Sequence, residues 1–201
     1  MTGELVFTKK IMTTLSNLYK AFNVEYHSKN RNRYFSNKAQ KDGFDEISKL
    51  YGEIAKIQED HCQMLLTMIK SFWEEKPSLD MKMDNEQQTD FGSVCNNLKA
   101  SIASQMYEYS IMYPAFIKEA ELEHYYAEAG KLQTFQIEEV LIRQRQEKIV
   151  QLLSEGNVCD RTPEKFWACK NCGSLQCCTI NPAACSSCSS VSEFIELTVA
   201  I

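Results

Sequence analysis

The sequence predicts a mainly α-helical protein: a four-helix bundle with one long crossover connection, followed by a small lobe held together by metal. Two observations lead to this prediction. Residues 1–155 contain four long stretches in which apolar residues recur every three or four positions, which is the period of an amphipathic helix. Residues 156–201 contain two Cys-x-x-Cys pairs. We therefore expect two domains, a bundle at 1–155 and a metal-held lobe with short strands at 156–201.

The first two predicted helices form a hairpin. One covers about residues 5–41 and the other about residues 44–73, and both show apolar residues at helical spacing. The dipeptide Asp42-Gly43 separates them, since this pair is a strong turn signal.

The second hairpin follows a polar connection at residues 77–91, which we interpret as the crossover. Its first helix covers about residues 93–121 and should be kinked at Pro114, because proline lacks a backbone donor. Its second helix covers about residues 123–153 and ends near Gly156. Two hairpins joined by one long connection give the ferritin-like bundle topology.

The cysteine pairs of the C-terminal lobe are the strongest indication of a metal site. Each Cys-x-x-Cys turn directs two thiolates at one centre, and two facing turns make a tetrahedral four-sulfur cage. The spacing alone suits iron and zinc equally, and a zinc cage would only stabilise the lobe. The four predicted ligands are Cys169, Cys172, Cys185 and Cys188.

Composition narrows the classes of function. The chain has 201 residues and a net charge of −5, which does not favour nucleic acid or an anionic membrane as a partner. No stretch approaches the roughly 20 apolar residues of a membrane span, and no signal peptide is evident. We expect a cytoplasmic location, with an organelle as the alternative. In such a reducing compartment the other cysteines should be free or metal-bound. They are Cys62, Cys95, Cys159, Cys177 and Cys178.

Several segments match the pattern of one known family. They are Ala21–Glu25, Lys29–Arg31, Tyr34-Phe35 and Asp42–Phe44 in the first hairpin, Asn97-Leu98 and Met112–Phe116 in the third helix, and Phe166–Gly173 and Phe194–Leu197 in the lobe. These segments resemble the rubrerythrin family, and the resemblance covers nearly the whole chain. It implies a ferritin-like di-iron bundle followed by a rubredoxin-like lobe. It also implies a non-haem iron oxidoreductase that reduces hydrogen peroxide at the di-iron centre with electrons passed through iron in the cysteine cage.

The resemblance also implies partners. Members form homodimers in which the lobe of one subunit serves the bundle of the other, and a separate redox protein donates the electrons. Iron is the implied metal of the cage, with zinc as a substitute. The second cysteine pair departs from the family, which usually has Pro after the first Cys and Gly after the last, where this chain has Ser186 and Ser189. The departure leaves the cage intact and bears on its redox potential.

The bundle ligands depart further from the family pattern. That pattern implies seven ligands, and this chain replaces three of them with Gln58, Gln105 and Ile142. One iron would depend mainly on the retained ligands and the other on the replaced ones. The four retained residues, expected to bind metal and to form the catalytic site, are Glu25, His61, Glu108 and Glu139.

These replacements leave two alternatives for function. A neutral amide offers an oxygen but no charge, and isoleucine offers no ligand, so we predict that the bundle binds one metal ion well and a second weakly or not at all. The first alternative is a rubrerythrin-like peroxide reductase with one or two bundle irons. The second is a non-enzymatic iron-binding or electron-transfer protein whose bundle site holds one metal or none.

The remaining polar residues have less specific interpretations. His27 and His124 match no ligand position, and surface or capping roles are expected for both. Glu53, Glu128 and Glu138 are expected to be solvated carboxylates and not substitute ligands.

Cysteines outside the cage and tyrosines near the predicted site also have two interpretations each. Cys62 should be a small core residue. Cys177 and Cys178 should be an exposed loop pair, with ligand exchange or redox activity as the alternative. The tyrosines either fill the core or donate hydrogen bonds to ligating carboxylates. They are Tyr26, Tyr107, Tyr109, Tyr113 and Tyr125.

Overall fold

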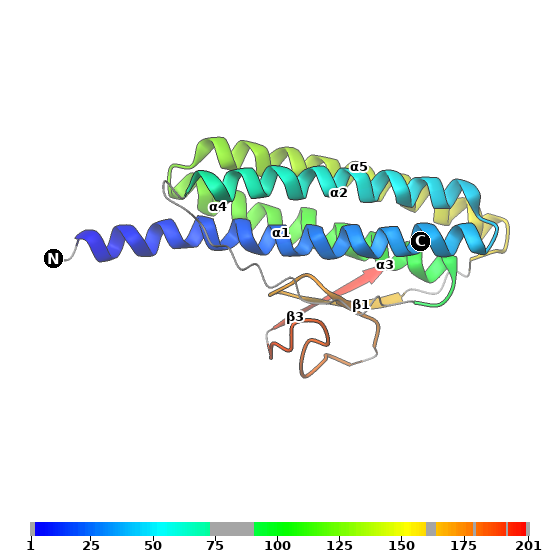
Figure 1. Ribbon diagram of the computed structural model, residues 1–201. Helices are drawn as coiled ribbons and strands as arrows, with labels where there is room; N and C mark the ends of the chain where they lie inside the picture. Colours follow the sequence, from blue (N-terminus) through cyan, green and yellow to red (C-terminus); the bar gives the residue numbers. More distant parts are fainter. Residues whose placement is uncertain (1–2, 73–90, 160–163, 179, 192, 200–201) are drawn as a thin grey trace.

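Long helices form the larger part of the molecule, and the small lobe lies against one side of them (Figure 1). The computed structural model describes residues 3–72, 91–159, 164–178, 180–191 and 193–199. The mainly α-helical bundle with a small stranded lobe is confirmed. The expected crossover at residues 77–91 falls outside the described residues except for Phe91. The helices are α1 (Gly3–Lys41), α2 (Asp45–Ser71), α3 (Val94–Tyr107), the π-helical turn η1 (Glu108–Met112), α4 (Tyr113–Leu122) and α5 (Tyr126–Glu155).

The predicted turn between α1 and α2 is present. Gly43 has a φ of +84°, in the left-handed region that glycine adopts without a steric penalty. The backbone N–H of Phe44 donates to the carbonyl of Ala39 at 2.8 Å, which satisfies one of the last carbonyls of α1. The chain reverses there, and α1 and α2 pack along their length as the predicted hairpin. None of the helices in the described ranges is long and apolar enough to cross a bilayer.

Where the sequence predicts a kink at Pro114, the structure has a π-helical turn at Glu108–Met112, just before the proline. Proline has no N–H, and its ring would clash with the carbonyl four residues earlier in a regular helix. The helix therefore widens over Glu108–Met112, and Pro114 lies in the first turn of α4. Turns of this kind are frequent at functional sites. Its first residue, Glu108, is fully buried in the bundle interior.

The lobe is a three-stranded antiparallel sheet of strand order β2-β1-β3. Apolar side chains of the lobe pack against the bundle: the Phe166 ring lies 5.7 Å from the Phe91 ring, and Leu197 and Val199 belong to the same apolar core as α3. The boundary predicted at residue 155 stays a prediction, because α5 ends there while the core continues into the lobe. The strands are β1 (Glu164–Cys169), β2 (Leu175–Gln176) and β3 (Phe194–Val199).

A disulfide bond joins Cys95, near the start of α3, to Cys159, just after α5. The expectation that all cysteines outside the cage are free or metal-bound is therefore wrong for these two. They are 64 residues apart in the sequence, but α3 and α5 pack side by side and bring them together. Cys62 is buried as predicted. Cys177 is exposed as expected, but Cys178 is half-buried and packs against the cage cysteines, so the expectation of an exposed pair is wrong for Cys178.

Candidate metal centres

The four predicted cage cysteines converge in the lobe. Their sulfur atoms all lie within 4.8 Å of one another. The Cys169–Cys188 and Cys172–Cys185 sulfur pairs are 3.8 Å and 3.7 Å apart. A tetrahedral metal with sulfur bonds of about 2.3 Å requires sulfur–sulfur edges of about 3.8 Å. The donor set therefore fits a four-coordinate iron or zinc ion.

Backbone hydrogen bonds shape the two cysteine turns in the same way. The N–H of Gly173 donates to the Cys169 carbonyl at 2.8 Å, and the N–H of Ser189 donates to the Cys185 carbonyl at 2.9 Å. Gly173 and Ser189 both have positive φ, at +68° and +55°. Ser189, where the family usually has glycine, thus adopts a left-handed conformation that costs an L-residue roughly 1 kcal/mol. The cage geometry is retained despite this departure.

The first cysteine turn packs directly on helix α1. A Cβ atom placed on Gly173 would lie 2.6 Å from Cγ2 of Val24, so only glycine allows this approach. Val24 immediately precedes Glu25. Tyr107, just before Glu108, lies between the lobe and the bundle interior, and burial together with the Cys169 and Glu108 side chains raises its pKa. The cage is therefore adjacent to the helices that supply the predicted bundle ligands.

Three of the four retained bundle residues form one cluster. Ligand atoms of Glu25, His61 and Glu139 lie within 4.8 Å of one another, and all three side chains are buried. The Nδ1 atom of His61 is 3.0 Å from Oε1 of Glu25 and 3.5 Å from Oε1 of Glu139. Nδ1 is therefore the nitrogen that faces the two carboxylates and would bind a metal between them. We call these three residues the bundle site.

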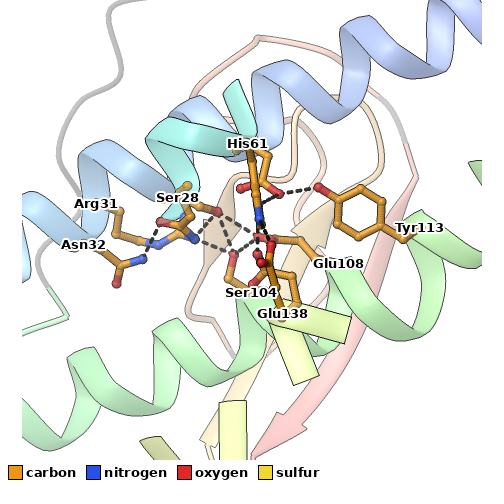
Figure 2. Close-up of polar contacts among 11 residues, drawn as sticks. Ser28, Arg31, Asn32, His61, Ser104, Glu108, Tyr113 and Glu138 are labelled. Carbon is orange, nitrogen blue, oxygen red and sulfur yellow. Dashed lines mark hydrogen bonds and ion pairs between the residues drawn. The ribbon is translucent and has the colours of Figure 1, made fainter. Parts of the chain in front are cut away.

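Glu138 contacts the other nitrogen of the same histidine. Its Oε2 lies 2.6 Å from Nε2 of His61, so the expectation of a purely solvated carboxylate at 138 is wrong (Figure 2). The side chain is 42% exposed, which explains why helical position alone suggested a solvated residue. A carboxylate at Nε2 keeps the proton on that nitrogen and leaves Nδ1 free to bind metal.

Burial and crowding of acidic groups determine the charge of the bundle site. Burial alone would lower the pKa of His61, but the carboxylates of Glu25 and Glu138 outweigh it and raise the pKa to about 9. Burial, with added repulsion from neighbouring carboxylates, raises the pKa values of Glu108 and Glu139. Buried carboxylates so close together need a cation to stay ionised, and a metal ion bound by Glu25 and Glu139 would provide it.

Glu108 differs from the other retained residues, because its Oε1 accepts hydrogen bonds from two serines. Ser28 and Ser104 each donate to it at 2.8 Å, and both hydroxyls accept from the guanidinium of Arg31, as Figure 2 shows. Burial and the neighbouring Glu108 carboxylate raise the pKa of Glu139. Glu108 thus lies beside the bundle site without belonging to its closest cluster.

The three replaced positions provide hydrogen bonds and apolar packing. Gln58 and Gln105 are fully buried, and Oε1 of Gln58 accepts a hydrogen bond from Asn32 at 3.0 Å. Ile142 packs against Leu50 and Ile54 of α2. No described side chain at these three positions supplies a charged ligand.

Other candidates are separated from the bundle site or have a different role from the one expected. His27 is 5% exposed, so the surface role expected for it is wrong; it packs against the ring of Tyr26. His124 lies exposed in the turn before α5, as expected. Glu53 pairs with Arg145 at the surface.

Among the tyrosines, Tyr113 donates a hydrogen bond to Oε1 of Glu25 (Figure 2).

Unpaired acceptors support metal binding at the bundle site. Oε2 of Glu25, Oε2 of Glu108 and both carboxylate oxygens of Glu139 are buried without a hydrogen-bond donor. Such groups are costly unless a cation binds them. Oxygen and imidazole donors together suit iron, as well as other divalent transition metals. The residues therefore fit one iron ion.

The chain is similar to several known proteins. A family model described as Rubrerythrin matches residues 16–139. The chain is 29% identical to a putative rubrerythrin of Methanocaldococcus jannaschii over 195 residues, covering 95% of both chains. It is 30% identical to a rubrerythrin of Nitratidesulfovibrio vulgaris over 189 residues, covering 92% and 93%. A solved structure of fully reduced, all-ferrous nigerythrin shares the fold, with a TM-score of 0.61 at 21% identity over 92% of this chain and 86% of that one.

Proposed function

The chain belongs to the rubrerythrin family, and from that premise we propose that it reduces hydrogen peroxide with electrons passed from the cysteine cage to the bundle site. One observation supports this most. The cage turn at Gly173 packs on Val24, beside the bundle ligand Glu25. Such proximity favours electron transfer between the two centres.

The residues of each centre have definite roles in this proposal. The cage cysteines hold one iron, and Glu25, His61 and Glu139 hold another. Each ferrous ion could donate one electron. Reduction of hydrogen peroxide to two water molecules requires two electrons and two protons. We expect both protons to come from solvent.

Partners and location are part of the same proposal. We expect a homodimer and a separate protein that reduces the cage. Ile137 and Leu141 lie one turn apart on α5 and are 56% and 54% exposed, which makes this face a candidate contact. A cytoplasmic location suits free cage thiols, while the Cys95–Cys159 disulfide is the observation against it. Zinc is the expected substitute where iron is scarce.

A rapid-mixing experiment tests the peroxide reductase. Reduced, iron-loaded protein is mixed anaerobically with less than one equivalent of peroxide, and the ferric cage is followed by its visible absorbance. The cage should reoxidise quickly in the wild type and in the control His124→Ala, and slowly in His61→Ala. Equal rates in all three proteins would mean that peroxide attacks the cage directly.

The second candidate is an electron carrier or iron binder without peroxidase activity. The apolar packing of Ile142 and the amides at Gln58 and Gln105 favour it, because a second iron would lack charged ligands there. In this case a ferrous cage would pass electrons to an added redox protein while peroxide is left unconsumed. The same rapid-mixing data separate the two candidates, since only the first predicts prompt reoxidation by peroxide.

A further inference from the structure

Hydrogen bonds connect four fully buried polar side chains across the bundle interior. Nε2 of Gln146 donates to the hydroxyl of Ser101 at 2.7 Å. That hydroxyl donates to Oδ1 of Asn32 at 2.9 Å, and Nδ2 of Asn32 donates to Oε1 of Gln58 at 3.0 Å. We call these four residues the amide network. It joins α5, α3, α1 and α2, and it ends at one of the replaced ligand positions.

The hydrogen bonds of the amide network all run in one direction. Each amide has a donor at one end and an acceptor at the other, and the hydroxyl of Ser101 has one proton. If one of these groups turned alone, a donor would face a donor, so all of them have to turn together. The hydroxyl also lies 3.5 Å from Oε1 of Gln105, which is too long to compete with the 2.9 Å bond to Asn32. The orientation of Gln58 is therefore coupled to that of Gln146.

The end at α5 favours the observed direction. Oε1 of Gln146 is buried and has no donor within the described part of the chain. In the reversed direction Gln146 would instead leave its N–H groups unpaired there. Unpaired N–H groups are rarer in protein interiors than unpaired carbonyl oxygens, so reversal is unfavourable at this end.

The end at α2 favours the same direction. Gln58 lies three residues before His61, and residues at this spacing share one face of a helix. Its Oε1 is bound to Asn32, so Nε2 is the end that remains for the interior, and this atom has no acceptor among the described residues. Carboxylate oxygens of Glu25 and Glu139 are buried nearby and also unpaired. An N–H group is more favourable beside such oxygens than a second oxygen would be.

This orientation matters for metal binding, because a side-chain amide binds a cation through its oxygen. We infer that the amide network turns the N–H end of Gln58 toward the bundle site, and that this orientation, in addition to the missing charge, prevents Gln58 from binding a second metal ion. Ser101 is then a positioning residue that acts through Asn32. The inference rests on the proposed function only in assuming that a metal occupies the bundle site.

Cobalt(II) titration of the full-length protein tests the inference. The background is Ile142→His, which adds an imidazole one turn after Glu139 so that a second bundle ion can be measured. Bound cobalt is counted by elemental analysis, and sulfur-to-cobalt absorption bands identify the cage ion. Ser101→Ala lets Asn32 and Gln58 turn without Gln146, so the second-ion affinity should rise about tenfold. Ser101→Thr keeps the hydroxyl and should leave that affinity unchanged.

Gln58→Glu distinguishes orientation from a general loosening of the bundle. A carboxylate has an oxygen at either end, so the direction of the amide network should not affect its binding of metal. In the Ile142→His/Gln58→Glu protein, Ser101→Ala should therefore leave the second-ion affinity unchanged. An equal gain with glutamine and with glutamate at 58, or a gain with neither, would overturn the inference.

Neutron diffraction tests the orientation directly, and it decides even if Ser101→Ala does not fold. Crystals of the metal-free wild type are exchanged into D2O, and deuterium marks Nε2 of Gln58. We expect deuterium on the atom that faces away from Asn32. Deuterium on the atom that faces Asn32 would overturn the inference. Failure of peroxide turnover with the expected orientation and affinities would refute the proposed function and leave this inference intact.

Discussion

At the scale of single residues, His61 organises the bundle site. One ring nitrogen faces Glu25 and Glu139, and the other faces Glu138, so carboxylates lie on both sides of the imidazole. A metal on Nδ1 requires the neutral ring, and the carboxylate at Nε2 selects that tautomer and fixes the ring plane. Glu138 therefore has a definite role, although it is no candidate for direct coordination at its present position.

Replacing Glu138 should weaken metal binding at the bundle site. Glu138→Gln removes the charge that orients His61, and losses of this kind typically reduce metal affinity about 10- to 100-fold. Cobalt(II) competition with a chelator measures the change, with the cage ion as an internal reference. The control is Glu53→Gln, which removes a surface carboxylate paired with Arg145. Equal affinities in both variants would contradict the role assigned to Glu138.

At the scale of secondary-structure elements, the contact between the first cysteine turn and α1 relates the two centres. The turn between β1 and β2 needs a left-handed residue at 173, and the adjacent helix leaves no space for a side chain there. One glycine thus satisfies both a backbone and a packing requirement. The contact brings Cys172 next to the helix that contributes Glu25.

Gly173→Ala should loosen the lobe for both reasons. The left-handed conformation costs about 1 kcal/mol and the clash with Val24 adds about as much, so we expect a loss of about 2 kcal/mol in the free energy of unfolding of the zinc-loaded protein. Val24→Ala removes both Cγ atoms and should recover part of the loss in the double variant. Urea unfolding measures the four proteins of this cycle.

A control variant and the thermodynamic cycle test whether the loss in Gly173→Ala comes from the contact between the cysteine turn and Val24. Gly130→Ala lies in α5 with nothing within 4 Å of the added Cβ, and it should be neutral or slightly stabilising. Strictly additive losses from Gly173→Ala and Val24→Ala would mean that the turn does not rest on α1 in solution.

At the scale of the whole molecule, the disulfide and the lobe secure one end of the bundle. Cys95 and Cys159 connect the start of α3 to the segment after α5, just before the chain enters the lobe. Strands β1 and β3 of the lobe pack against α3. The path from bundle to lobe is therefore fixed covalently as well as by apolar packing.

Removing this disulfide should destabilise the whole protein. Cross-linking residues 64 apart restricts the unfolded chain, which is worth about 2–4 kcal/mol. The double variant Cys95→Ala/Cys159→Ala should lose about that much in urea unfolding without reductant. Cys62→Ala, a buried cysteine outside any disulfide, shows the cost of losing a core thiol alone. A thiol-alkylating reagent is then added to denatured wild-type protein without reductant. If all nine cysteines react, the disulfide has not formed under those conditions.

The fold and the ligand types could be predicted because they depend on short-range patterns. Helical periodicity, the turn at Asp42-Gly43, the break near Pro114 and the cysteine spacing each concern residues within a few positions of one another. The retained ligands Glu25, His61 and Glu139 could be identified by resemblance, and the structure brings them together.

The sequence by itself therefore determined the four helices, the cysteine cage and the types of residue available to a bundle metal. Only the tertiary structure decided how those residues pair: Glu138 with His61, Arg31 with Glu108 through two serines, and Cys95 with Cys159. The physical reason is that spacing along a helix specifies which face a side chain lies on. Contacts between helices depend on their relative rotation and axial register, which are set by packing of the whole core.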